Sequence, residues 1–166
     1  MLKIYITKIL GVIAPRLLVF YRSLKENYEP LKEFKITTQG FKFIGNDSMM
    51  AGTFEHGETA VFEKIIKHVD IVVNVGANVG YYSCIALNLN KRVIAFEPMP
   101  TNIRTLLANI HANNWESKIE IFPLALSDKT GVVEMFGEGT GASLINGWAG
   151  LVSGKTTLVP TSTLDQ

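Results

Sequence analysis

From Val69 onward, short apolar runs alternate with stretches of helix length. The predicted order is strand 71–75, helix 80–88, strand 92–96, helix 100–112 and strand 118–124, with further strands at 132–136 and 156–159. Helix 100–112 is predicted to turn Ile103, Leu106, Leu107 and Ile110 inward. Strands that alternate with helices form parallel sheets with right-handed crossovers. The continuous apolar run 71–75 is typical of a strand covered on both faces. The chain is therefore expected to be α/β, with a doubly wound, mostly parallel sheet.

The part before this alternation is predicted to be an extension over residues 1–57, and residues 58–166 are predicted to form the α/β domain. Apolar residues spaced by three and four in residues 1–25 predict an amphipathic helix. Basic residues beside that stripe leave two alternatives, weak contact with an anionic membrane surface or packing on the domain. A hairpin is predicted over 34–36 and 41–44, and a helix over 58–68 with Val61, Phe62, Ile65 and Ile66 on one face.

Composition excludes several function classes. The 166 residues carry 16 Lys and Arg against 15 Asp and Glu, which gives no basic field for nucleic acid. The single cysteine, Cys84, forms no internal disulfide, is expected to be buried, and has no histidine at a zinc-site spacing. No signal peptide or membrane span is indicated. We expect a cytoplasmic protein without a metal site and without a nucleic-acid partner; its oligomeric state is open.

A glycine-containing turn follows the first strand of the predicted sheet. Residues 72–80 read Val-Val-Asn-Val-Gly-Ala-Asn-Val-Gly, and Gly76 and Gly80 allow a sharp turn and a close ligand approach. Such a turn at the carboxyl end of a strand in a doubly wound sheet is where nucleotide-like ligands bind. A tight turn without any ligand would use similar glycines.

An acidic residue, Glu97, ends the second predicted strand, and it follows Gly76 by about 20 positions. At that separation an acid is placed to accept hydrogen bonds from the hydroxyls of a ribose. The alternative is a carboxylate that only caps the helix starting near Pro100. Dinucleotide binders have glycine where this chain has Asn78, because a side chain there obstructs the pyrophosphate. A nucleoside ligand without phosphate, such as S-adenosylmethionine, fits this turn better.

Three runs together resemble the FkbM family of S-adenosylmethionine-dependent methyltransferases. They are residues 74–82, residues 95–102 with Leu106 and Asn109, and Leu-Ala-Leu-Ser-Asp at 124–128. The resemblance implies a Rossmann-like methyltransferase fold and methyl transfer to a hydroxyl of a small-molecule or glycan acceptor, such as a sugar or secondary metabolite. It further implies a role for the loop 141–144 in framing the acceptor. The cofactor-binding residues that it implies are Asn74, Gly76, Ala77, Asn78, Gly80, Glu97, Pro98, Ala125 and Leu126.

Two departures from the family pattern affect the expected activity. The family usually has aspartate where this chain has Asn74, so we expect weaker cofactor binding, which Asn74→Asp would reverse. The family also continues past residue 165, so the sheet is expected to be incomplete at the carboxyl end. No residue stands out as general base; Glu55, His56 and Glu58, which precede the first strand, are candidates, although surface residues or a helix cap would read the same. A nicotinamide- or nucleotide-binding domain and a catalytically inactive fragment remain alternatives.

Overall fold

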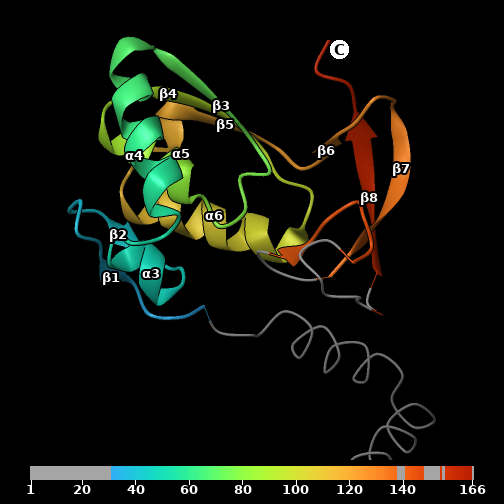
Figure 1. Ribbon diagram of the computed structural model, residues 1–166, viewed down its shortest axis with the longest axis horizontal. Coiled ribbons are helices and arrows are strands. Elements are labelled where there is room, and N and C mark those ends of the chain that lie inside the picture. Colours follow the sequence, from blue (N-terminus) through green and yellow to red (C-terminus); the bar gives the residue numbers. More distant parts are fainter. Residues whose placement is uncertain (1–30, 138–140, 148–153, 155, 166) are drawn as a thin grey trace, which may run out of the picture. The chain divides into compact units, whose positions relative to one another are not determined.

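A computed structural model describes residues 31–137, 141–147, 154 and 156–165 of the chain. The described residues from Glu33 onward form one compact unit (Figure 1). The helix expected in residues 1–25 lies outside the described residues. None of the helices in the described part is long and apolar enough to cross a membrane.

The predicted parallel sheet is present. Strands β3 (Ile71–Val75), β4 (Arg92–Phe96) and β5 (Ile119–Phe122) lie in the order β3-β4-β5, and both strand pairs are parallel. Helix α5 (Tyr81–Asn88) connects the first pair and helix α6 (Pro100–Ala112) the second, with the short 3-10 helix η2 (Glu116–Lys118) before β5. This β-α-β-α-β unit confirms the predicted α/β, Rossmann-like fold class.

Both crossover helices pack on the same face of this sheet (Figure 1). Cys84 of α5 and Leu106 of α6 belong to one buried cluster with Val93 of β4. On the opposite face, side chains of β3 are half exposed: Ile71 at 48%, Val73 at 49% and Val75 at 57%. The prediction that residues 71–75 are buried on both faces is therefore wrong for the described residues, because α5 and α6 cover one face only.

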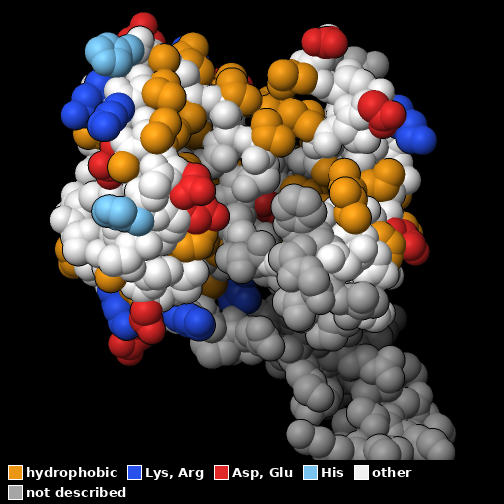
Figure 2. All heavy atoms as spheres, viewed as in Figure 1, with side chains coloured by type: hydrophobic (Ala, Val, Ile, Leu, Met, Phe, Trp, Pro, Cys, Tyr) orange, Lys and Arg blue, Asp and Glu red, His pale blue; other side chains and the backbone are white. Residues whose placement is uncertain are grey.

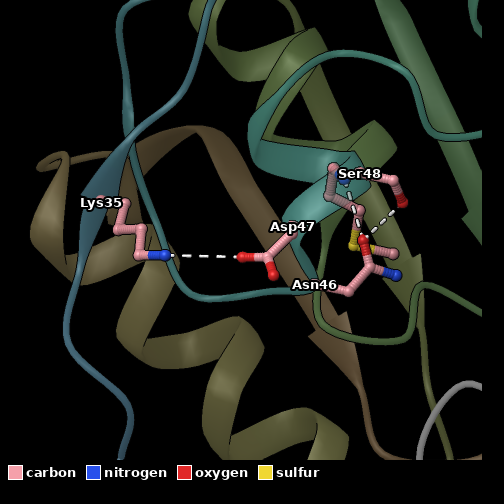
Figure 3. A network of polar contacts seen from close by, with 5 residues as sticks. Lys35, Asn46, Asp47 and Ser48 are labelled. Carbon is pink, nitrogen blue, oxygen red and sulfur yellow. Dashed lines mark hydrogen bonds and ion pairs between the residues drawn. The ribbon is translucent and has the colours of Figure 1, made fainter.

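The predicted hairpin is confirmed, with β1 (Lys35–Ile36) and β2 (Lys42–Phe43) paired antiparallel. It leads into the short helix α3 (Asp47–Met50), whose N-cap Asn46 accepts hydrogen bonds from the Met49 N–H and the Ser48 hydroxyl, both at 2.8 Å (Figure 3). Lys35 reaches Asp47 at 3.4 Å and ties the hairpin to this helix (Figure 3). Phe43 is completely buried in the main core. Part of the expected extension thus packs within the same compact unit as the sheet.

The helix predicted over 58–68 is α4 (His56–Ile65) followed by the 3-10 helix η1 (Ile66–His68). Its buried side consists of Thr59, Phe62 and Ile66, spaced by three and four. Val61 and Ile65, which were predicted on the inner face, are 55% and 58% exposed. The apolar residues of this segment lie on two adjacent faces, and only one of them meets α5.

Helix α6 has the predicted bounds but a different inner face. Leu106 and Ile110 are buried as predicted, whereas Leu107 is 51% exposed. Two amides, Asn102 and Asn109, are buried in its place. The helix therefore turns a partly polar stripe toward the rest of the molecule, and these amides form hydrogen bonds there.

The strands after β5 form a second sheet and do not extend the first. Strands β6 (Ala125–Leu126), β8 (Thr156–Ser162) and β7 (Gly131–Phe136) lie in the order β6-β8-β7. The pair β6 and β8 is parallel, whereas β7 and β8 are antiparallel. Met99, Ala125, Met135 and Val159 form a small core on this sheet. Hydrophobic side chains are visible on the surface of this region (Figure 2). Val132 and Leu158 of this sheet are 67% and 69% exposed.

Candidate functional site

The glycine turn lies between β3 and α5, where the sequence predicts it. Gly76 and Gly80 have φ angles of +73° and +92°, in the left-handed region that favours glycine. A Cβ on Gly76 would meet no protein atom within 4 Å, so the turn offers open space there. A Cβ on Gly80 would clash with the side chain of Leu106. The first glycine leaves room beside the turn, and the second allows α5 to pack against α6.

Every backbone N–H group of this turn already has an acceptor within the protein. In chain order, Gly76 and Ala77 donate to the Phe96 carbonyl oxygen (both 2.9 Å), Asn78 to Glu97 Oε2 (2.7 Å), Val79 to Asn78 Oδ1 (2.7 Å) and Gly80 to the Ala77 carbonyl oxygen (2.8 Å). Phosphate-binding turns instead point their N–H groups at the ligand. These five groups are therefore not available to a phosphate.

Glu97 connects the turn to the beginning of α6. Its side chain is only 3% exposed, and Oε2 accepts the Asn78 N–H at 2.7 Å. Oε1 accepts the Met99 N–H at 2.9 Å and Asn102 Nδ2 at 3.2 Å. A carboxylate has about four acceptor positions, so three of them are used. Glu97 therefore has the helix-capping role that the sequence offered as the alternative. One acceptor position, at Oε2, remains for a further donor.

A cavity of about 360 Å³ lies at the carboxyl ends of β3 and β4. This volume is within the range of small-molecule sites. Six of the predicted cofactor-binding residues line it: Gly76, Asn78, Glu97, Pro98, Ala125 and Leu126. Among the described residues that line it, Glu97 alone carries a charge. The cavity thus combines one buried carboxylate with otherwise neutral walls.

Three predicted site residues do not line this cavity. Ala77, within the turn, is buried, and Gly80 packs on Leu106 and Cys84. Asn74 donates from Nδ2 to the Ser83 hydroxyl at 2.9 Å. It lines a second cavity, of about 410 Å³, whose other lining residues are Glu55, Glu58, Phe62, Val72, Val73 and Tyr82.

Two of the candidate general bases, Glu55 and Glu58, line the second cavity. The Tyr82 hydroxyl donates to Glu55 Oε2 at 2.7 Å. Burial, together with the nearby Glu55 carboxylate, raises the pKa of Tyr82 to about 12. Tyr82 therefore stays protonated near neutral pH and serves as a hydrogen-bond donor. His56 is exposed at the start of α4 and does not line either of these cavities.

Sequence reasoning assigned no cofactor role to the apolar wall of the first cavity. Phe96 stacks on Phe122 with ring centroids 5.1 Å apart and planes 18° apart. Met135, Leu144 and Ile145 complete the wall. The loop 141–144, which the family resemblance singled out, borders this cavity, and Ser143 exchanges two backbone hydrogen bonds with Phe136. Asn102 also lines it, and only its place in the FkbM-like run could have signalled this.

No protein-family model matches the sequence, and no curated protein matches it. Three solved structures from Pyrococcus horikoshii are similar to parts of the chain. TYW2 in complex with MeSAdo is 24% identical with a TM-score of 0.44, over 55% of this chain and 35% of that one. A protein assigned as a transferase is 23% identical with a TM-score of 0.43, over 55% and 36%. A protein assigned as an RNA methyltransferase is 20% identical with a TM-score of 0.38, over 61% and 50%.

The chain thus spans half or less of the length of these structures. Their TM-scores lie below 0.5, so the fold class rests on the strand order and crossovers of this chain. Membership of the FkbM family stays a prediction.

Proposed function

We propose that the chain is the cofactor-binding part of an S-adenosylmethionine-dependent methyltransferase of the FkbM kind. The observation that carries this proposal is the hydrogen bonding of the turn at 76–80, where all five N–H groups are already used. A dinucleotide would place its pyrophosphate at such a turn and find no donors among them. A sulfonium nucleoside without phosphate does not need these donors.

The charge of the cavity and the open space beside the turn fit such a cofactor. Glu97 gives the cavity a negative charge, which attracts a cationic sulfonium ligand. The open space beside Gly76 is where a side chain would obstruct the ligand. The residues that would hold the cofactor are Gly76 and Asn78 at the turn, Glu97 at the ribose, and Ala125 with Leu126 beside the base.

In this proposal the bound cofactor supplies an electrophilic methyl group. The chain's own residues bind, orient and exclude water. Glu97 Oε2 has an acceptor position for a ribose hydroxyl, and the Asn78 N–H holds this carboxylate in place. Phe96, Met135 and Leu126 form apolar walls that keep water away from the ligand. We further propose, from the family resemblance alone, that the acceptor is a hydroxyl of a sugar or secondary metabolite.

Calorimetric titration with S-adenosylhomocysteine and, separately, with NAD tests the proposal. We expect saturable binding of the first ligand and none of the second. Binding of NAD alone would establish the nucleotide-binding alternative. A folded chain that binds neither would be a catalytically inactive module, and the proposal would be wrong.

A matched pair of variants tests the role of Glu97. Glu97→Gln removes the buried charge, and we expect it to weaken S-adenosylhomocysteine binding at least about tenfold, as expected for a lost charge-assisted hydrogen bond. Glu120→Gln removes a carboxylate that is 59% exposed on β5, where it pairs with Arg92 at 3.5 Å. This control should bind like the unmodified chain. Equal affinities for both variants would remove Glu97 from the site.

A further inference from the structure

Asn109 of α6 and Asn113, which caps the end of this helix, bind the backbone of Lys42 in β2 and of Ile44 just after it in the same way. Asn113 accepts the Lys42 N–H at 2.9 Å and donates to the Lys42 carbonyl oxygen at 2.8 Å. Asn109 accepts the Ile44 N–H at 2.7 Å and donates to the Ile44 carbonyl oxygen at 3.0 Å. Residues two apart in an extended chain direct their backbone groups to the same side. The two amides therefore take the place of a neighbouring strand along β2.

Asn109 has one contact that Asn113 lacks. Its Nδ2 also donates to the Val79 carbonyl oxygen, at 2.8 Å. Val79 belongs to the turn at 76–80, and Asn109 is completely buried beneath it. One side-chain amide thus joins the hairpin to the turn, which lies 35 residues further along the chain.

The turn at 76–80 also holds Glu97, the carboxylate that lines the cavity. The Val79 N–H donates to Asn78 Oδ1 at 2.7 Å, and the Asn78 N–H donates to Glu97 Oε2 at 2.7 Å. Asn78 has a φ of +54°, a left-handed conformation that asparagine tolerates better than most residues. A residue in this conformation needs support from its surroundings, and the hydrogen bond from Asn109 fixes the peptide group between Val79 and Gly80, one peptide further along the turn.

We propose that Asn109 is a positioning residue for the cofactor. It does not line the cavity, and it acts by fixing the Val79 carbonyl and, through it, Asn78 and Glu97. The link to the cofactor rests on the proposed function, whereas the effect on the turn does not. The consequence is that the segment at 35–44, remote in sequence from the turn, supports the conformation of the cavity through the Asn109 side chain.

The first experiment needs no ligand. Asn109→Ala removes the bonds to Ile44 and to the turn, whereas Asn113→Ala, the matched control, removes the bonds to Lys42 and to the Asn109 carbonyl oxygen and none to the turn. Asn109→Ser serves as a milder replacement should the alanine variant not fold. In amide NMR spectra and hydrogen exchange, we expect shifted and less protected signals at residues 77–80 for Asn109 variants only. Unchanged turn signals, or equal changes in both variants, would overturn the proposal.

The second experiment measures affinity well below the unfolding temperature of each variant, so that a loss of stability alone has no effect. We expect Asn109→Ala to weaken S-adenosylhomocysteine binding about tenfold and Asn113→Ala to change it less than twofold. Adenosine, which keeps the ribose that Glu97 is proposed to bind, should also bind the Asn109→Ala variant more weakly than it binds the unmodified chain. Equal losses in both variants would overturn the link to the ligand. A wild-type chain that binds no S-adenosylhomocysteine would contradict the proposed function, while the turn signals would still decide the positioning role.

Discussion

The two faces of the parallel sheet differ in burial although the strands read alike in sequence. On the helix-covered face Val93 is 2% exposed and Ala95 is completely buried. On the opposite face Val73 and Val75 of the neighbouring strand are half exposed. Apolar β-branched composition therefore indicates a strand but does not reveal which face is covered. Stability should depend on the covered face and change little with the open one.

The largest expected effect comes from α6. Leu106→Ala removes a fully buried side chain between α5 and α6, and we expect it to lower the free energy of unfolding by about 2–5 kcal/mol. Leu107→Ala, the adjacent control at 51% exposure, should change it by about 0.5 kcal/mol or less. Denaturant unfolding measures both. Similar losses would contradict the assigned inner face of the helix.

A smaller difference is expected within the sheet itself. Val93→Ala should destabilise by about 1–2 kcal/mol, because two methyl groups leave a packed core. Val73→Ala carries the same loss of strand propensity but removes half-exposed groups. The difference between the two losses of unfolding free energy measures how much burial on the helix-covered face contributes to stability. If Val73→Ala costs as much as Val93→Ala, the two faces are covered alike.

Cys84, on the covered face, makes stability depend on pH. Burial raises the pKa of its thiol above the ordinary value of 9.0. The unfolded chain loses this proton near pH 9 and the folded chain does not, so the stabilisation is present below pH 9 and is lost as pH rises. We expect a loss of about 1 kcal/mol between pH 9 and pH 10. Cys84→Ala should show a correspondingly flatter profile, and parallel profiles would place the thiol in contact with solvent.

The smallest effect is expected at the edge of the sheet. Asn74→Asp adds a carboxylate at the end of β3, and the Ser83 hydroxyl can donate to it in place of accepting. We expect S-adenosylhomocysteine to bind a few-fold tighter through its ammonium group, on the order of 0.5–1 kcal/mol. Asn114→Asp, on an exposed loop, is the matched control. Asn74 lines the second cavity. An Asn74→Asp variant whose affinity is unchanged would therefore show that the ammonium group binds elsewhere.

The order of elements from 71 to 122 was predictable from periodicity, and the bounds of β3, β4 and α6 agree with the prediction. Side-chain direction was less predictable. Leu107 was assigned to the core because it is apolar, yet Asn109 is buried in the structure because β2 and the turn supply partners for its amide. Those partners come from segments 65 and 30 residues away. No local pattern contains that information.

For the site, a glycine turn after one strand and an acid at the end of the next predict that Gly76 and Glu97 lie together, and both line one cavity. Asn74 and Ala125 are implied by the family resemblance alone; Ala125 lines this cavity, whereas Asn74 lines the other. The apolar wall from Met135 and the loop at 141–145 comes from the second sheet, whose pairing order β6-β8-β7 could not be deduced from the strands alone.

The self-contained hydrogen bonding of the turn at 76–80 also has a kinetic consequence. An enzyme that consumes its cofactor must release the used cofactor and bind a new cofactor molecule in every catalytic cycle. A loop that relied on its ligand for hydrogen bonds would lose order each time the ligand left. Under the proposed function, acceptors within the protein would satisfy these donors both with and without the ligand. The empty and filled forms can therefore share one backbone conformation, and ligand exchange need not wait for the loop to refold.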